Sequence, residues 1–407
     1  MLSVADVLDA RERVAETTRH TPLEYSHTFS AMTGADVHLK LELFQRTGSF
    51  KLRGATNRIA TLSEAQRENG VVTASAGNHA QGVALAATRG GVDSKIVMPE
   101  HAPVSKVKAT ERYGGEAVLY GADYSEAQAE AHRIERDEGR TYVHAFDDDY
   151  VMAGQGTIGL EIYDDLPGVD TVVVPIGGGG LISGVSTAIN HLSPETRIVG
   201  VQATGAETVH ESLDKGFPVT LEEVDTIADG IATGGVSEKT LRMIREHVDE
   251  VVTVTDTEIA RAILLLMERA KQVVEGSGAA SVAAVLSDDL DVGGETVMPL
   301  LCGGNLDMTQ LRTVLIYALA ARKQILRIRV RIDDRPGRLE EISGVIADWD
   351  ANIHDVRHDR SVDDLDVGEA YLVFDVETSG AEHAADIVDG IAAEGYAVDV
   401  VNHRSDA

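Results

Sequence analysis

The sequence is poor in aromatic residues, in cysteine and in long hydrophobic runs. Aromatic residues make up 4% of the 407 positions, whereas hydrophobic residues of all kinds make up 43%. A large core is therefore expected, built mainly from aliphatic side chains. A single cysteine, Cys302, excludes an internal disulfide and fits a reducing cytosol. No run of about 18 apolar residues occurs, so a membrane-spanning helix is not expected.

Positive charge is also scarce. The chain has 36 basic and 67 acidic residues and a formal net charge of −31 at pH 7. Such a surface repels nucleic acid and anionic membranes, so neither is an expected partner. Few of the basic residues are lysine, and an acidic, lysine-poor surface is typical of halophilic proteins. The first residues lack the basic segment of a secretion signal, so we expect a soluble, cytoplasmic protein.

A lysine between small residues and an aromatic ring is the first candidate for chemistry. In residues 47–55, Thr-Gly-Ser-Phe-Lys-Leu-Arg-Gly-Ala, Lys51 follows Phe50 and begins a helix predicted over residues 51–61. A lysine amine is a nucleophile only when it is partly desolvated, and a flat ring can pack against a heterocycle. We interpret Lys51 as the residue that carries pyridoxal 5'-phosphate as a Schiff base. The alternative is a solvated surface lysine, the more common role of this residue type.

Strand and helix patterns alternate through the first half of the chain. Successive strand–helix units predict a parallel sheet with helices on both faces, the α/β class. One strand runs into a turn at the start of a helix, where backbone N–H groups favour a carboxylate. This turn is Ser75, Ala76, Gly77 and Asn78. The predicted strands cover 37–41, 71–74, 95–98 and 117–120, and the predicted helices 79–89, 105–113 and 124–137.

Four consecutive glycines lie between an apolar strand, residues 170–176, and a helix predicted from Ile182. Glycines here let backbone N–H groups approach an anion where a Cβ would clash. The spacing is not Gly-x-Gly-x-x-Gly and lacks the Lys-Ser/Thr ending of a P-loop, so a single phosphate fits better than a dinucleotide. A flexible turn is the alternative. The run is Gly177, Gly178, Gly179 and Gly180, followed by Leu181.

The pattern changes after a helix predicted over residues 309–323. Residues 326–332 alternate between aliphatic side chains and arginines, which indicates a half-buried antiparallel strand. Later signals complete a βαββαβ order, typical of a ferredoxin-like module. We place the boundary near 323–325. Residues 1–322 then form a catalytic domain, with a small subdomain over about 49–150 inserted in it, and residues 326–407 form a second domain.

Four short motifs together resemble the threonine/serine dehydratases of the pyridoxal-phosphate enzymes of fold type II, the tryptophan-synthase-β-like class. The resemblance covers residues 5–320, and the motifs are residues 48–55, Ser75–Gly82, Gly177–Leu181 and Cys302–Asn305, in that order. It implies parallel sheets in two subdomains and pyridoxal 5'-phosphate as the cofactor. Residues 326–407 resemble an ACT domain, a small-molecule sensing module that follows the catalytic part in many such enzymes.

The resemblance implies a role for each matching position. Lys51 would be the Schiff-base lysine and proton carrier, with Phe50 against the ring. Asn78 would hydrogen-bond the cofactor 3'-oxygen, and Cys302 would lie beside the pyridine nitrogen. The phosphate would be held by Gly177, Gly178, Gly179, Gly180 and Leu181, and the substrate carboxylate by Ser75, Ala76, Gly77 and Asn78.

The residue beside the ring nitrogen bears on the reaction. A neutral thiol at Cys302 cannot keep that nitrogen protonated, which disfavours a long-lived carbanion and favours β-elimination over transamination. By residue type alone, a buried structural cysteine is the alternative. Ala76 stands where serine racemases of the family carry a second serine, and alanine cannot move a proton. Gln202 stands where metal-binding relatives carry a glutamate, so one ligand charge is lost and no metal is expected.

We therefore expect a threonine ammonia-lyase (threonine dehydratase) that converts L-threonine, and also L-serine, to a keto acid and ammonia. A serine-specific dehydratase or racemase of the same family is an alternative, as are a non-catalytic amino-acid sensor and a nucleotide-binding oxidoreductase. The ACT-like domain is expected to bind an amino acid effector, isoleucine or valine, near Asp334, Gly337 and Asn352. A dimerisation or packing module is the alternative. A homo-oligomer, dimer or tetramer, is also expected.

Overall fold

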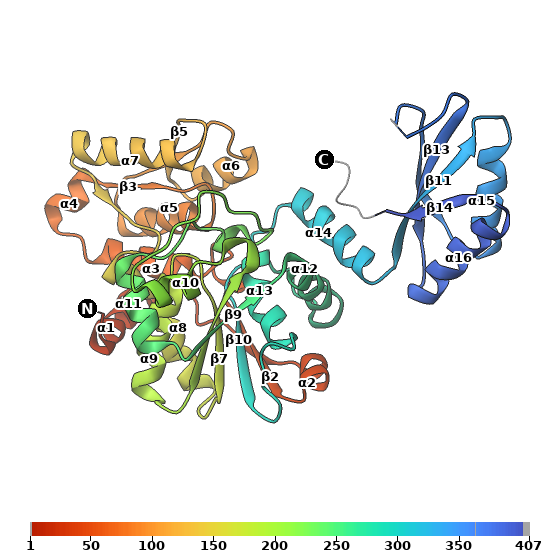
Figure 1. Cartoon of the computed structure of the whole chain (residues 1–407). Helices are drawn as coiled ribbons and strands as arrows, with labels where there is room; N and C mark the ends of the chain where they lie inside the picture. The colour runs from red at the N-terminus through yellow and green to blue at the C-terminus, as the bar shows by residue number, and fades with distance from the viewer. Residues whose placement is uncertain (1, 363, 402–407) are drawn as a thin grey trace. The chain divides into compact units, whose positions relative to one another are not determined.

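The computed structural model describes residues 2–362 and 364–401 (Figure 1). Contacts divide the chain into two units, Met1–Leu306 and Asp307–Ala407. The sequence placed the boundary near 323–325. The structure instead groups helix α14 (Met308–Ala321) with the second unit, in which it contacts strand β11 (Ile325–Asp333).

The first unit contains a long helix that the sequence analysis missed. Helix α8 (Asp149–Asp165) is buried along most of its length, so no solvated face marks the helical period in its sequence. Helix α9 (Gly180–Leu192) begins inside the glycine run rather than at Ile182. No helix in the described part of the chain is long and apolar enough to span a bilayer. The other helices of this unit are α1 (Val4–Val14), α2 (His27–Thr33), α3 (Lys51–Ala60), α4 (Glu64–Asn69), α5 (Asn78–Gly90), α6 (Val104–Arg112), α7 (Tyr124–Glu138), α10 (Val209–Lys215), α11 (Glu238–His247), α12 (Asp256–Leu265) and α13 (Gly276–Val285).

The larger sheet of the first unit has six strands in the order β1-β2-β10-β7-β8-β9. Every neighbouring pair except β1 and β2 is parallel, so the prediction of an α/β fold with parallel strands is confirmed. Ile158 of α8 and Val185 of α9 pack with Val172 and Leu300 of the sheet in one core. The strands are β1 (Leu23–Tyr25), β2 (Asp36–Leu41), β7 (Thr171–Pro175), β8 (Arg197–Ala203), β9 (Glu250–Val254) and β10 (Thr296–Leu301).

The smaller sheet has four parallel strands in the order β5-β4-β3-β6. Alternate residues of a strand point to opposite faces, and here both faces are covered. Val72 packs with Ala131 of α7, whereas Val71 packs with Leu52 of α3 and Val83 of α5. The strands are β3 (Val71–Ala74), β4 (Ser94–Met98), β5 (Glu116–Leu119) and β6 (Thr141–Tyr142).

The second unit is built on a four-stranded antiparallel sheet in the order β12-β13-β11-β14. With two helices in the chain order βαββαβ, this is the predicted ferredoxin-like arrangement. Ile342 and Ile387 of the helices pack on Ile328 and Phe374 of the sheet. The remaining elements are α15 (Arg338–Asp348), β12 (Ile353–Asp359), β13 (Glu369–Glu377), α16 (Ala381–Ala393) and β14 (Ala397–Val400).

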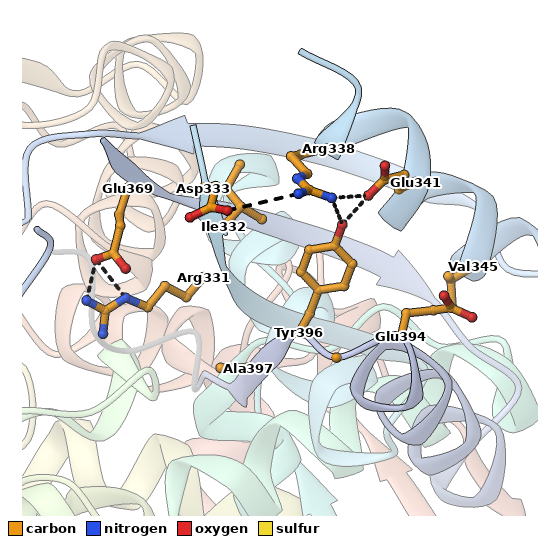
Figure 2. A pocket seen from close by; sticks show the side chains of 11 residues that line it. Arg331, Ile332, Asp333, Arg338, Glu341, Val345, Glu369, Glu394, Tyr396 and Ala397 are labelled. Atoms are coloured by element: carbon orange, nitrogen blue, oxygen red, sulfur yellow. Dashed lines mark hydrogen bonds and ion pairs between the residues drawn. The ribbon is translucent and has the colours of Figure 1, made fainter. Parts of the chain in front are cut away.

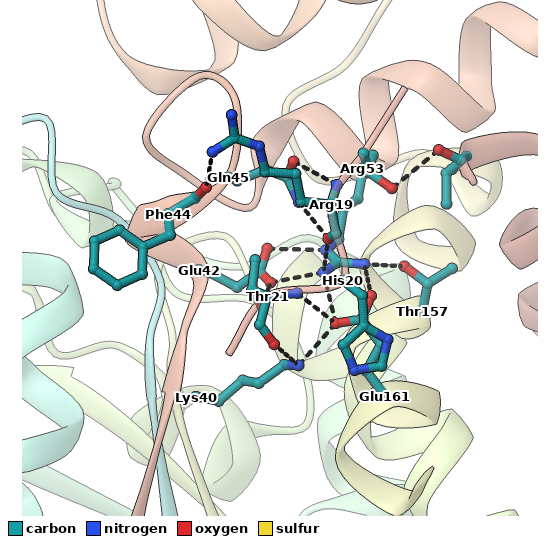
Figure 3. A network of polar contacts seen from close by, with 12 residues as sticks. Arg19, His20, Thr21, Lys40, Glu42, Phe44, Gln45, Arg53, Thr157 and Glu161 are labelled. Atoms are coloured by element: carbon teal, nitrogen blue, oxygen red, sulfur yellow. Dashed lines mark hydrogen bonds and ion pairs between the residues drawn. The ribbon is translucent and has the colours of Figure 1, made fainter. Parts of the chain in front are cut away.

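A buried ion network holds helix α3 in the first unit (Figure 3). The guanidinium of Arg53 makes two-point contacts with Glu42, at 2.7 and 2.9 Å, and with Glu161, at 2.6 and 2.9 Å. Lys40 contacts Glu161 at 2.8 Å and donates to the Thr21 carbonyl at 2.8 Å. Arg53, Lys40 and Glu42 are buried. Two cations and two carboxylates thus tie α3 to β2 and α8.

Removal of the Arg53 guanidinium should strongly destabilise the first unit. In Arg53→Met, the carboxylates of Glu42 and Glu161 stay buried without this cation, a change that costs about 3–5 kcal/mol. Denaturant unfolding followed by circular dichroism measures the loss. Arg133→Met is the matched control, because Arg133 also pairs with two carboxylates but is 55% exposed, and surface pairs contribute little. An equal decrease in the free energy of unfolding in the two variants would contradict the prediction.

Candidate active site

Two motifs that are far apart in the sequence meet as a short antiparallel bridge. Ser49 pairs with Gly303, and the Phe50 N–H donates to the Cys302 carbonyl at 3.0 Å. The bridge brings the start of α3, and with it Lys51, to the carboxyl end of β10. Ligand groups gather at this edge of parallel sheets.

The Lys51 side chain is partly buried, with its amine turned toward a backbone carbonyl. The Lys51 Nζ donates to the Ala145 carbonyl at 3.0 Å and lies 5.1 Å from the centre of the Phe50 ring. Burial lowers the pKa of Lys51 to about 8, although Cys302 and Glu275 partly offset this shift. A far larger fraction of this amine is therefore neutral and nucleophilic at neutral pH than for a solvated lysine.

The four-glycine turn packs around Phe146, the residue after the carbonyl that Lys51 contacts. A Cβ on Gly178 would lie 2.3 Å from the Phe146 ring, and one on Gly180 would lie 2.8 Å from its Cα. Gly179 has φ +86° and caps α9 without a side-chain hydrogen bond. The first N–H groups of a helix have no intrahelical partner, so this turn can offer them to an anion. Lys51 and the glycine turn thus meet at one place.

The start of α5 carries the residues expected to bind a substrate carboxylate. Gly77 is the N-cap of α5 and has no side chain to cap it; its N–H donates to Ser75 Oγ at 3.1 Å. Asn78 Nδ2 donates to Glu275 at 2.7 Å, and Asn78 Oδ1 accepts from Asn305 at 2.8 Å. These two hydrogen bonds join the turn between β3 and α5 to the turn before α13 and to the segment after β10.

Glu275, Ser277 and Asn305 belong to this site, but the sequence analysis assigned them no role. The Ser277 hydroxyl donates to Glu275 at 2.6 Å, and the Cys302 thiol donates to Ser277 at 3.6 Å. Burial raises the pKa of Glu275. Burial, with Glu275 nearby, raises the pKa of Cys302 to about 12, so the thiol is neutral. In the sequence, only the glycine-rich turn at 274–279 pointed to a site here. A glutamate in a turn is usually solvated, so Glu275 itself gave no sign of a role.

Two histidines near Lys51 are held in the neutral state. His79 is buried, its Nε2 contacts the Val143 carbonyl at 2.9 Å, and burial together with the Lys51 charge lowers its pKa to about 3. His144 Nδ1 accepts from the Asp147 N–H at 2.7 Å, and burial lowers the pKa of His144 as well. Neither ring adds a second positive charge beside the amine.

Gln202 uses its buried side-chain amide inside the protein. Its Oε1 accepts from the N–H groups of Thr208, at 3.1 Å, and Val209, at 2.9 Å, and its Nε2 donates to the Ala206 carbonyl at 3.2 Å. Within residues 2–362 and 364–401, no group of three or more His, Cys, Asp or Glu residues is placed to hold a metal ion.

The three residues expected near an effector site lie at two ends of the second unit's sheet. Asp334 follows β11 at the end of the sheet where β13 begins, and it contacts Arg360 at 2.6 Å. Gly337 caps α15 with φ +98°. Asn352 follows α15 and donates to Glu377, at the other end of β13. Helix α15 returns along the sheet, so residues before and after it lie at opposite ends.

A pocket of about 730 Å³ lies in the second unit beside the turn from β11 to α15 (Figure 2). In its wall, Arg338 donates to Glu341 at 2.7 Å and to the Tyr396 hydroxyl at 3.2 Å, and Arg331 donates to Glu369 at 3.0 Å. The pocket therefore presents paired charges of both signs.

The residues of the first unit fit pyridoxal 5'-phosphate. The lowered pKa of Lys51 suits a bond to an aldehyde, and the uncapped start of α9 suits a phosphate. Cys302 supplies a neutral thiol. Gly177 begins the four-glycine turn and Leu181 follows it, and both residues are at least half-buried.

Known proteins match this chain over most of its length. A family model described as pyridoxal-phosphate dependent enzyme matches residues 14–303. An L-threonine ammonia-lyase of Thermotoga maritima is 44% identical over 401 residues, 98% of this chain and 100% of that protein. The processed form of threonine deaminase isoform 2 from Solanum lycopersicum is 39% identical, with a TM-score of 0.75 over 77% of this chain and 92% of that one. Maize serine racemase is 36% identical, with a TM-score of 0.74 over 79% of this chain and 99% of that one.

The lowered pKa of Lys51 predicts how the rate of pyridoxal 5'-phosphate uptake depends on pH. Only the neutral amine attacks the aldehyde, so the rate should rise with pH up to about 8 and then level off. Stopped-flow absorbance of the cofactor-free protein measures this rate, and Nα-acetyl-lysine in parallel corrects for titration of the aldehyde. A rate that keeps rising toward pH of about 10, as for a solvated amine, would contradict the prediction.

Proposed function

We infer the function of this chain from one premise: it belongs to the family of pyridoxal-phosphate-dependent enzymes. Within that family it is an L-threonine ammonia-lyase, which converts L-threonine to 2-oxobutanoate and ammonia. The observation that carries this conclusion is the 44% identity, over 98% of the chain, to an L-threonine ammonia-lyase. The site described above supplies the chemical reason why such an enzyme would work.

We propose that the cofactor is held at three places. Lys51 holds it through its amine, the N–H groups of Gly177–Gly180 take the phosphate, and Asn78 and Cys302 face the polar atoms of the ring. Phe50, 9% exposed and packed in the main core, supports the ring. Bound pyridoxal phosphate supplies an electron sink for the electron pair left at the substrate α-carbon.

The chain's own residues provide binding and proton transfer. The start of α5, from Ser75 to Asn78, holds the substrate carboxylate through backbone N–H groups, which orients the α-hydrogen. Once the amino group of the substrate replaces Lys51 as the group that holds the cofactor, the freed Lys51 amine would take the α-proton, and the β-hydroxyl would leave with a proton as water. Hydrolysis then adds one water and releases ammonia. Because the Cys302 thiol is neutral, no acid keeps the ring nitrogen protonated, which favours elimination over a long-lived carbanion.

A serine racemase is the second candidate, since the maize enzyme is similar in sequence and fold. The residue that argues against it is Ala76, which packs against the core of the smaller sheet and has no group that can move a proton. L-Serine is expected as a second substrate, because the missing methyl group changes binding by only about 1–3 kcal/mol.

The reaction is tested with L-threonine, L-serine and D-serine on the same preparation. L-Threonine should give 2-oxobutanoate, L-serine should give pyruvate more slowly, and no D-serine should form. Lys51→Ala should lower kcat by at least about 10²–10⁴-fold, because it removes the proton-transfer group. Keto acids are measured with a coupled dehydrogenase, and serine enantiomers by chiral chromatography. Racemisation of serine faster than elimination would assign the chain to the second candidate.

We propose that the second unit is an ACT-type module that binds an amino acid. Its ferredoxin-like fold supports this, as does the pocket beside Asp334 and Gly337, in which Arg338 suits a carboxylate and Glu341 an ammonium group. Asn352 lies at the other end of the sheet, so it can contribute only from another copy of the chain, in a dimer or tetramer.

Isoleucine or valine should change the threonine kinetics of the full chain through a coupling free energy of about 1–3 kcal/mol. Arg338→Gln should weaken the response, because it removes a cation from the pocket wall. Arg357→Gln, exposed on β12 of the same sheet, should leave it intact. Initial rates over a range of threonine concentrations measure the effect, and sedimentation of the same samples reports the oligomer. Identical kinetics with and without both amino acids would remove the proposal.

A further inference from the structure

The side-chain amide of Asn78 is held at both ends. Its Nδ2 donates to Glu275 Oε1 at 2.7 Å, and its Oδ1 accepts from Asn305 Nδ2 at 2.8 Å. The same Nδ2 of Asn305 also donates to the Thr47 carbonyl at 2.7 Å. These four residues come from the turn before α3, the start of α5, the turn before α13 and the segment after β10.

Two groups that only accept hydrogen bonds fix the orientation of the Asn305 and Asn78 side-chain amides. A carboxylate and a backbone carbonyl both lack a donor. The Thr47 carbonyl therefore sets the nitrogen of Asn305 toward it, and this nitrogen also faces the oxygen of Asn78. The Glu275 carboxylate sets the nitrogen of Asn78 toward it. If the Asn78 amide were reversed, its nitrogen would face the nitrogen of Asn305 and its oxygen would face the carboxylate of Glu275. Neither contact is a hydrogen bond, so these partly buried groups would be left unpaired.

Glu275 also connects Asn78 with Cys302. The Ser277 hydroxyl donates at 2.6 Å to the same Oε1 that accepts from Asn78, and the Cys302 thiol donates to Ser277 at 3.6 Å. Asn78 and Cys302 are the two residues proposed to face the polar atoms of the ring. Glu275 is thus the shared acceptor behind both of them.

We propose that Glu275 is a positioning residue for the cofactor: together with Asn305, it locks the Asn78 amide so that the second N–H of Asn78, and not its carbonyl, serves the cofactor 3'-oxygen. That oxygen carries negative charge, so a donor stabilises it and a carbonyl oxygen repels it. The inference rests on the proposed function, because it requires pyridoxal phosphate in this site. Glu275 acts through Asn78 and takes no part in proton transfer to the substrate.

The test is a double-mutant cycle on cofactor affinity with the full chain. Wild type, Glu275→Gln, Asn78→Ala and the double variant are freed of cofactor and titrated with pyridoxal 5'-phosphate, following its absorption band. Glutamine has an NH2 group in place of one carboxylate oxygen, so it accepts hydrogen bonds at one atom instead of two. Glu275→Gln should therefore weaken the binding of pyridoxal 5'-phosphate roughly tenfold, which corresponds to the loss of one charge-assisted hydrogen bond. It should also shift the wavelength or the pH midpoint of the band. In the double variant, Glu275→Gln should weaken binding much less than it does alone, because its path through Asn78 is gone and only the contact through Ser277 remains.

Glu295→Gln is the matched control. Glu295 accepts from Thr171 at 2.6 Å and from Arg197 at 3.1 Å, next to the start of β10 and thus at the opposite end of that strand from Cys302. It should change stability without changing cofactor affinity or the band. Should Glu275→Gln fail to fold in a thermal melt, Asn305→Ala replaces it in the same cycle, because it removes the donor to the Asn78 oxygen.

Wild-type affinity and spectrum in Glu275→Gln, or losses in the double variant that multiply those of the single variants, would overturn the inference and leave the proposed function untouched. A wild-type chain that binds no pyridoxal phosphate would overturn both. The inference is supported if Glu275→Gln weakens cofactor binding in the wild-type background and has a much smaller effect in the Asn78→Ala background.

Discussion

Two cations on the same helix need opposite environments, and the site depends on that difference. Arg53 lies between the carboxylates of Glu42 and Glu161, which raise its pKa and keep it charged despite burial. Lys51, also on α3, contacts a carbonyl instead, and burial lowers its pKa to about 8. The carboxylates stabilise the charged form of one residue, whereas desolvation favours the neutral form of the other. The ion network thus anchors helix α3, while the Lys51 amine lies outside that network and keeps its lowered pKa.

The remaining parts of the site converge on that amine through backbone contacts. The bridge between Ser49 and Gly303 sets the start of α3 against the end of β10, and Phe146 fills the space that the glycine run leaves open. The glycine run therefore needs small residues for two reasons: they leave its N–H groups accessible, and they leave room for the ring of Phe146. A substitution in the run would disturb both functions together.

The polar groups proposed to lie behind the cofactor ring bear on how one fold can support different reactions. Cys302 is kept neutral by burial and by Glu275, and Glu275 also binds Asn78. With Cys302 at the ring nitrogen, as we propose, this neutral thiol would limit how long charge persists at the α-carbon. On this proposal an ammonia-lyase lacks the second proton-transfer group that a racemase needs, and Ala76 provides none.

The sequence by itself determined the α/β class, the ferredoxin-like second unit and the cofactor, because local periodicity and short motifs carry that information, and it singled out Lys51 as the residue expected to hold that cofactor. It did not reveal α8, whose buried surface hides the helical period, nor the hydrogen bonds of Glu275 and Asn305 with Asn78, which join segments about two hundred residues apart. It also grouped Asp334 with Asn352, which the return path of α15 separates. Tertiary structure alone decided these points, because the pKa of a side chain and the direction of an amide depend on neighbours that only folding brings together.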